Sequence, residues 1–216
     1  MADQETIFSA AINLLYALDS RLGEQQQVLS TMLFGGMAVI YYGVNPERIT
    51  DDLDLCTDEK DFDKVEDLRM WLNKECKNVG LRRVDFDQVQ NFPGPFLVIA
   101  FSHAITITGF KGHPRFQWLR LAIPQPLPLF VLKIEAAYKR QSRADYEDAL
   151  DLLGRLQLPV KDLMRFYKQY KKKFDTIEKT MPDFRFSDFL SKFFAEASEE
   201  RFTSSRIRNV LKSLSS

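Results

Sequence analysis

The stretch from Leu33 to Thr57, LFGGMAVIYYGVNPERITDDLDLCT, contains residues that could bind a nucleotide and a metal ion. Gly35 and Gly36 lie between an apolar run, 28–34, and a short helix-like segment, 37–42. Glycine has no Cβ, and the start of a helix offers unpaired N–H groups and the positive end of a dipole. The glycine pair therefore predicts a turn, between a strand and a helix, that a phosphate can approach closely.

Asp52 and Asp54 follow the glycine pair and alternate with Leu53 and Leu55. In a strand, alternate side chains share a face, so the two carboxylates would point the same way with Cα atoms roughly 7 Å apart. Paired carboxylates suit Mg²⁺, or Mn²⁺ in its place, and two such ions can clamp the entering and leaving oxygens of a phosphoryl transfer. Taken alone, residues 51–54 also fit a solvated loop.

The rest of the chain predicts the elements that would position these residues. Apolar residues at helical spacing indicate helices at 7–22, with Gly23 as a C-cap, and at 61–77, capped by Asp58 or Asp61. Short apolar or alternating runs separated by turn residues predict strands at 81–89, 96–101, 104–110 and 117–123. We therefore expect an α/β (α+β) fold, a small mixed β-sheet with helices packed on one side.

The proline-rich segment 124–128 cannot be helical throughout and is taken as the end of the sheet domain. Beyond it the pattern is helical, at 129–140, 144–156, 160–179 and 184–197. The predicted organisation is an α/β domain at 1–126 followed by a C-terminal helical region at 127–216.

Composition restricts the compartment and the partners. The 216 residues include 30 Lys plus Arg and 30 Asp plus Glu, so any basic patch for nucleic acid must be local. The two cysteines have no zinc-like spacing, and no apolar run is long enough to span a membrane. We expect a cytoplasmic protein that does not associate with membranes.

The order of motifs in the first stretch resembles a known family. The glycine pair, a short helix and then R-x-T-x-D-L-D-L, from Arg48 through Thr50 to Leu55, resemble the nucleotidyltransferase fold of the DNA polymerase β superfamily. The closest resemblance is to AbiEii-type toxins and related minimal nucleotidyltransferases. It implies nucleotide binding by Gly35, Gly36, Arg48 and Thr50, with Asp52 and Asp54 as metal ligands and catalytic residues.

A second group of residues is similar to the second pair of motifs in AbiEii-like proteins. The matching positions are Lys133, then Arg140 or Arg143, then Asp145 and Asp148. The resemblance implies that Lys133 contacts the triphosphate and that Asp148 is a base or a metal ligand. In one unbroken helix Lys133 and Asp148 would lie about 22 Å apart, so a shared site requires a break near 141–142.

The second group also has a purely structural interpretation. Lys133 would then be an exposed helix lysine, and Asp145 and Asp148 would cap the following helix and pair with Arg143. In either interpretation we expect Lys133 to be replaceable by alanine at little cost in stability.

Polymerase β-type enzymes commonly carry a third carboxylate on a later strand. Asp85 and Asp87 alternate correctly within 84–87. If the strand at 104–108 is instead the one that corresponds to this later strand, it offers only Thr106 and Thr108. The third carboxylate would then be missing from the sheet, and Asp148 would have to take its place.

The resemblance implies a Mg²⁺-dependent enzyme that transfers an NMP from an NTP to a hydroxyl. The acceptor would be RNA, such as a tRNA 3′ end, or a protein, and the enzyme could be the toxin of a toxin-antitoxin pair with an antitoxin as partner. The alternative is a module that keeps the fold without the chemistry and binds nucleotide, RNA or a partner protein.

Overall fold

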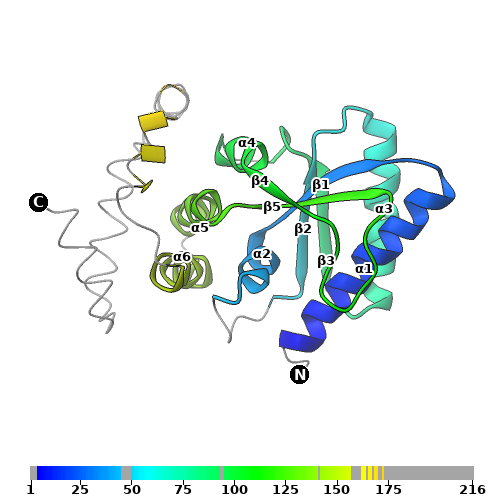
Figure 1. Ribbon diagram of the computed structural model, residues 1–216, viewed down its shortest axis with the longest axis horizontal. Helices are drawn as coiled ribbons and strands as arrows, with labels where there is room; N and C mark the ends of the chain where they lie inside the picture. The colour runs from blue at the N-terminus through cyan, green and yellow to red at the C-terminus, as the bar shows by residue number, and fades with distance from the viewer. Residues whose placement is uncertain are drawn as a thin grey trace, which may run out of the picture. The chain divides into compact units, whose positions relative to one another are not determined.

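The computed structural model describes residues 4–44, 50–92, 95–140 and 142–156, together with 162, 163, 165, 166, 168, 169 and 172. The chain divides into two compact units, Met1–Lys133 and Ile134–Ser216. The first unit contains the sheet and is drawn with its element labels in Figure 1. Arg48 lies outside the described residues.

The first unit is built on a five-stranded mixed sheet of order β3-β2-β1-β5-β4. Its strands are β1 (Leu29–Phe34), β2 (Asp52–Thr57), β3 (Arg83–Gln88), β4 (Ala104–Ile107) and β5 (Leu119–Pro124). β1 is antiparallel to β2 and parallel to β5, β2 is parallel to β3, and β4 is antiparallel to β5. The predicted small mixed sheet is confirmed.

Helices cover both faces of this sheet. Helices α1 (Gln4–Glu24) and α3 (Phe62–Asn78) lie on one side, and α2 (Gly35–Tyr41) and α4 (Pro95–Ser102) lie on the other (Figure 1). On the second side Leu97 and Ala100 of α4 form a buried cluster with Met32 of β1 and Cys56 of β2. The expectation that all helices pack on one side is therefore wrong.

The error originates in residues 96–101, which we expected to form a strand and which form α4. The run PFLVIAFS is apolar throughout, so its hydrophobicity alone does not distinguish a helix from a buried strand. Pro95 is the first helical residue, a position where the missing N–H costs no hydrogen bond. Burial then follows the helical period, because the pairs 96–97 and 99–100 are buried while Val98 between them is 45% exposed.

The predicted helices at 7–22 and 61–77 are present as α1 and α3, and Asp61 caps α3 by accepting a hydrogen bond from the Lys64 amide. Gly23 is not a C-cap, because α1 continues to Glu24. A Cβ on Gly23 would lie 2.8 Å from Nε1 of Trp118, so glycine is required there for the packing of that indole ring. The position of the glycine is explained by tertiary packing and not by helix termination.

Helices α5 (Pro126–Arg140) and α6 (Arg143–Arg155) follow the sheet. The break between them falls where we predicted it, and Ser142 caps α6 by accepting a hydrogen bond from the Asp145 amide. α5 begins at Pro126, so two prolines of the segment 124–128 lie in its first turn, a position that tolerates them. The helices expected at 160–179 and 184–197 lie largely outside the described residues.

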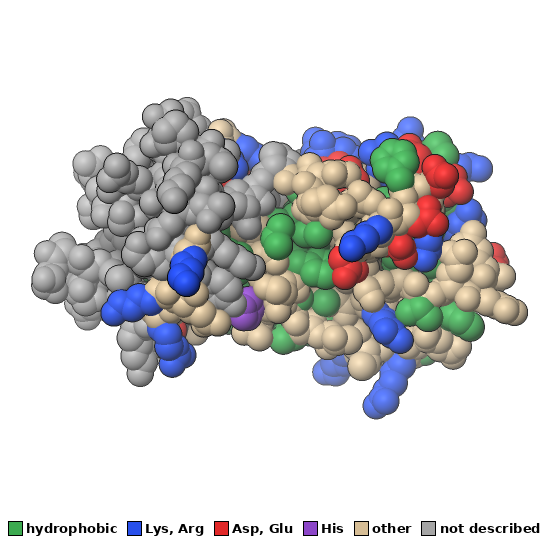
Figure 2. Space-filling model, turned by 90° about the horizontal axis from the view of Figure 1, so that it is seen from above, with side chains coloured by type: hydrophobic (Ala, Val, Ile, Leu, Met, Phe, Trp, Pro, Cys, Tyr) green, Lys and Arg blue, Asp and Glu red, His purple; other side chains and the backbone are tan. Residues whose placement is uncertain are grey.

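The surface of the molecule carries charges of both signs. In Figure 2 lysine and arginine side chains are interspersed with acidic ones beside a group of hydrophobic side chains, on the face shown there. Among the described residues, no helix combines the length and the apolar character needed to cross a bilayer.

Candidate active site

Gly35, the first glycine of the pair, lies directly against Asp54, the second carboxylate of β2. Gly35 adopts φ +67, a conformation that side chains disfavour, and a Cβ added to it would overlap Oδ2 of Asp54. Phe34, the residue before it, pairs with Asp54 across the antiparallel β1–β2 ladder. Glycine at position 35 is thus what allows the Asp54 carboxylate to lie against the turn between β1 and α2.

Gly36 likewise lies close to the side chain of Thr50. A Cβ on Gly36 would lie 2.8 Å from Cγ2 of Thr50 and 3.1 Å from its hydroxyl oxygen. Both glycines therefore make room for side chains that immediately precede or belong to β2. This explains the pair without reference to a ligand, and binding of a phosphate at the same turn stays a prediction.

Asp52 and Asp54 lie on β2 as predicted, and the solvated-loop alternative for them is wrong. Burial alternates along the strand, with both carboxylates partly exposed and Leu53 and Leu55 buried. The two aspartates therefore share the face of the sheet that also contains Cys56 and Met32. Whether they bind metal stays a prediction.

The neighbouring strand places a third carboxylate beside this pair. In the parallel β2–β3 register Asp54 pairs with Asp85, and Cys56 pairs with Asp87. Paired residues of adjacent strands share a face with Cα atoms about 4.8 Å apart, so Asp85 lies next to Asp54. Thr106, the alternative position, lies on β4 at the opposite edge of the sheet.

Two arginines, which the sequence interpretation missed, contact these carboxylates. Arg82 donates two hydrogen bonds to the Asp52 carboxylate, from Nε to Oδ1 at 3.1 Å and from Nη2 to Oδ2 at 2.7 Å. Nη2 of Arg83 lies 3.4 Å from Oδ2 of Asp52 and 2.8 Å from Oδ2 of Asp85. The hydrogen bond to Asp52 raises the pKa of Arg82, so this cation stays charged.

The contact between these residues was not visible in the sequence because Arg82 and Asp52 are thirty positions apart. The only available signal was the pair of arginines directly before an alternating acidic strand. The arginine pair points to a contact with Asp52 only when β3 is known to pair with β2, in the register that aligns Arg83 with Asp52.

Beyond Asp85 a groove of about 280 Å³ runs along β3, lined by Arg69, Asn73, Arg83, Val84, Asp85, Phe86, Asp87 and Phe92. Asp87 in this groove accepts hydrogen bonds from the Gln88 amide and from Asn91 Nδ2. Phe92 packs edge-to-face on Phe34, with 5.2 Å between ring centroids. The groove therefore adjoins the carboxylate face and combines an aromatic wall with charges of both signs.

Another titratable group close to the carboxylates is Cys56, which is fully buried. Burial raises the pKa of its thiol, with smaller contributions from Asp54 and Asp58, so it remains protonated. Within the described ranges, no group of three or more His, Cys, Asp or Glu side chains is arranged to hold a metal ion. A cation here would take two carboxylates and complete its shell with water or substrate oxygens, which is the usual pattern for Mg²⁺.

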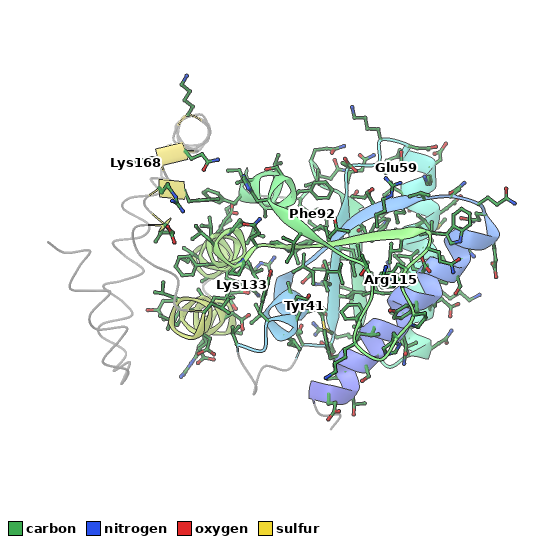
Figure 3. All side chains as sticks on the ribbon, in the orientation of Figure 1. Tyr41, Glu59, Phe92, Arg115, Lys133 and Lys168 are labelled. Carbon is green, nitrogen blue, oxygen red and sulfur yellow. The ribbon has the colours of Figure 1, made fainter. Side chains whose placement is uncertain are left out.

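Lys133 lies on α5, the last residue of the first unit, and only 4% of it is exposed. The alternative that Lys133 is an exposed helix lysine is therefore wrong. Figure 3 labels Lys133 on α5 and Tyr41 on α2, two helices on the same side of the sheet. Its contact with a triphosphate stays a prediction.

We expect Lys133→Ala to lower the free energy of unfolding by about 2 kcal/mol, because it removes a buried aliphatic stem. Lys133→Met keeps most of that stem, so it should lower the free energy of unfolding by less than Lys133→Ala. The matched control is Lys74→Ala on the exposed face of α3, expected to change stability by less than about 0.5 kcal/mol. Urea denaturation measures all three; equal midpoints for Lys133→Ala and Lys74→Ala would contradict the burial of Lys133.

Asp148 belongs to the second unit, on α6, where it is fully buried. Asp145 lies in the first turn of α6, while the capping side chain is that of Ser142. Arg143 pairs with Glu147, Nε to Oε1 at 2.8 Å. A catalytic or metal-binding role for Asp148, together with Lys133, stays a prediction.

No protein-family profile matches the chain, and no curated protein matches it. One solved structure that is similar to it is an antigenic nucleotidyltransferase-like protein from Paracoccidioides brasiliensis. The similarity has a TM-score of 0.47 and 17% identity and covers 79% of this chain and 93% of that chain.

Proposed function

We propose that this protein is a Mg²⁺-dependent nucleotidyltransferase that transfers an NMP from an NTP to a hydroxyl group. The observation that carries the proposal is the position of Asp54, whose carboxylate lies against the Gly35 turn and beside Asp85. Asp52, on the same face of β2, supplies the second predicted carboxylate. A turn without side chains next to grouped carboxylates is the arrangement that a metal-bound triphosphate requires.

The residues at this site fit a divalent cation. The donors are carboxylate oxygens, the ligands that Mg²⁺ and Mn²⁺ prefer. Asp52 and Asp54 would hold the ion. When bound, it would neutralise charge on the phosphates and on the developing oxyanion.

In the proposed reaction the acceptor oxygen attacks the α-phosphorus, the bond to the β-phosphate oxygen breaks and pyrophosphate leaves. The hydroxyl proton passes to a base, the role we propose for Asp148 if it is not a metal ligand. Gly35, Gly36, Arg48 and Thr50 would position the phosphates. Lys133 would neutralise triphosphate charge, so that catalysis is mainly positioning and electrostatics.

For the acceptor we propose RNA, such as a tRNA 3′ end, or a protein hydroxyl. A cytoplasmic toxin acting with an antitoxin partner is the corresponding biological role. These finer assignments come from the motif resemblance of the Gly35–Asp54 and Lys133–Asp148 regions.

A second candidate function is a binding module without catalysis. The specific observation in its favour is the double hydrogen bond from Arg82 to Asp52, which engages both oxygens of one predicted metal ligand. In that case the site would bind a nucleotide, RNA or a partner protein without turnover.

Calorimetry with Mg²⁺ and each NTP, followed by transfer from labelled NTP to total RNA or lysate protein, tests the proposal. We expect micromolar nucleotide binding and label transfer, both lost when Asp52→Asn and Asp54→Asn are combined. Asp67→Asn, an exposed aspartate of α3, is the matched control and should behave like the parent protein. Binding without transfer would favour the nucleotide-binding module, and no binding of any NTP would contradict the proposal.

A further inference from the structure

Asp52 and Asp54 share one face of β2 but have different surroundings. Asp54 lies against Gly35, whereas Asp52 is held by two guanidinium groups. Arg82 engages both Asp52 oxygens, and Arg83 reaches Oδ2 from the paired position on β3. Three hydrogen bonds from arginine nitrogens thus occupy most of the roughly four lone-pair sites of the Asp52 carboxylate.

The geometry of the pair is specific. Arg82 presents Nε and Nη2 to the two carboxylate oxygens, the parallel arrangement in which guanidinium groups bind carboxylates most strongly. Its Nε also lies 3.4 Å from Oδ1 of Asp51, and its amide donates to the Asp51 carbonyl at 2.9 Å. The backbone contact keeps residue 82 beside the start of β2.

The two partners differ in exposure. The Arg82 side chain is 66% exposed, while that of Asp52 is 18% exposed. The arginine can therefore rotate into solvent without disturbing the core, whereas Asp52 stays on the sheet. Exchange of the arginine cations for a metal ion at Asp52 therefore requires movement of exposed side chains only, those of Arg82 and Arg83.

We propose that Arg82 is a latch on Asp52, which holds this carboxylate in the absence of a divalent cation and must release it when the cation binds. The inference rests on the proposed function, because it takes Asp52 as a metal ligand. Arg82 acts through Asp52 and is a positioning residue, not a catalytic one. Arg83, which bridges Asp52 and Asp85, assists it.

The expected size of the effect follows from the exposure of the pair. Ion pairs at exposed sites change an equilibrium by up to about fivefold, and salt reduces their strength. Arg82→Gln should therefore tighten divalent cation binding by about two- to fivefold at low salt. Arg82→Lys, which keeps the charge without the fork, should tighten it less.

The test is a titration of the full chain with Mn²⁺ alone, in which free Mn²⁺ is measured by electron paramagnetic resonance. Arg165→Gln is the matched control, because it removes an exposed arginine that pairs with Asp162 and not with Asp52. We expect tighter binding for Arg82→Gln, parent-like binding for Arg165→Gln, and a smaller difference at high salt. Equal Mn²⁺ affinities for Arg82→Gln and the parent, or equal tightening in both variants, would overturn the latch.

Asp54→Asn separates failure of this inference from failure of the proposed function. If the parent binds Mn²⁺, Asp54→Asn weakens that binding and Arg82→Gln leaves it unchanged, the metal site stands and the latch is wrong. If the parent and Arg82→Gln both fail to bind Mn²⁺, the proposed metal site is wrong and the latch is rejected with it. Thermal melting of each variant checks that the exposed substitutions leave the fold unchanged.

Discussion

Gly35→Ala is expected to reduce nucleotide transfer by about 100-fold and to destabilise the protein more than the matched substitution Gly43→Ala. Both glycines have nearly the same positive φ, +67 and +63; Gly35 is the first residue of α2, and Gly43 follows the C-cap of that helix. A Cβ on Gly43 would have nothing within 4 Å, whereas a Cβ on Gly35 would overlap Asp54. The two variants therefore share the backbone cost and differ in the clash.

The backbone cost of alanine in this conformation is about 1 to 2 kcal/mol, and we expect Gly43→Ala to show that loss alone. Overpacking at Gly35 should add about 1 to 3 kcal/mol and displace the Asp54 carboxylate. A displacement of about 1 Å at such a group can cost about 100-fold in rate. Urea denaturation and label transfer measure the two effects; if Gly35→Ala matches Gly43→Ala in both, the contact between the turn and Asp54 has no functional role.

Asp54→Asn is expected to reduce label transfer by about 10²- to 10³-fold, the usual cost of losing one preorganised charge contact. Asparagine has nearly the same shape as aspartate, so the packing against Gly35 is kept and thermal stability should change little. The comparison variant is Asp85→Asn, at the paired position on β3. Asp85 is 39% exposed and pairs with Arg83, so we expect a loss of about tenfold or less.

The same two variants decide the position of the third carboxylate. Equal losses for Asp54→Asn and Asp85→Asn would make Asp85 an essential third carboxylate. Transfer at the parental rate by Asp54→Asn would contradict the proposed site altogether. Mn²⁺ titration of each variant then tells whether a loss of rate reflects metal binding or a later step.

Several parts of the fold could be predicted because they depend on local patterns. The alternation of Asp52 and Asp54 with leucines is a strand signal, and it predicted both β2 and the shared face of the carboxylates. Asp58 or Asp61 was predicted as the cap of α3, and Asp61 is the cap, because capping needs only a side chain three residues before an amide. The break before α6 was predicted because Lys133 and Asp148 would lie too far apart in one unbroken helix to share a site.

Other features depend on contacts between distant segments and could not be predicted. The apolar run of α4 fits a helix and a buried strand equally well until its neighbours are known. The burial of Lys133 is not visible in a helix whose environment is unknown. The contact of Arg82 with Asp52 depends on the β2–β3 register. The need for glycine at position 23 follows from the packing of Trp118, a residue far away in the sequence.

The location of β3 has a consequence for self-association. β3 is the outer strand of the described sheet, beyond β2, so one row of its backbone N–H and C=O groups has no strand partner among the described residues. Such an edge could pair with the same edge of another molecule and start aggregation. Charged side chains on an edge strand disfavour such pairing, and Arg83, Asp85 and Asp87 alternate along β3. Charged residues beside the candidate active site therefore also protect the folded protein against sheet extension.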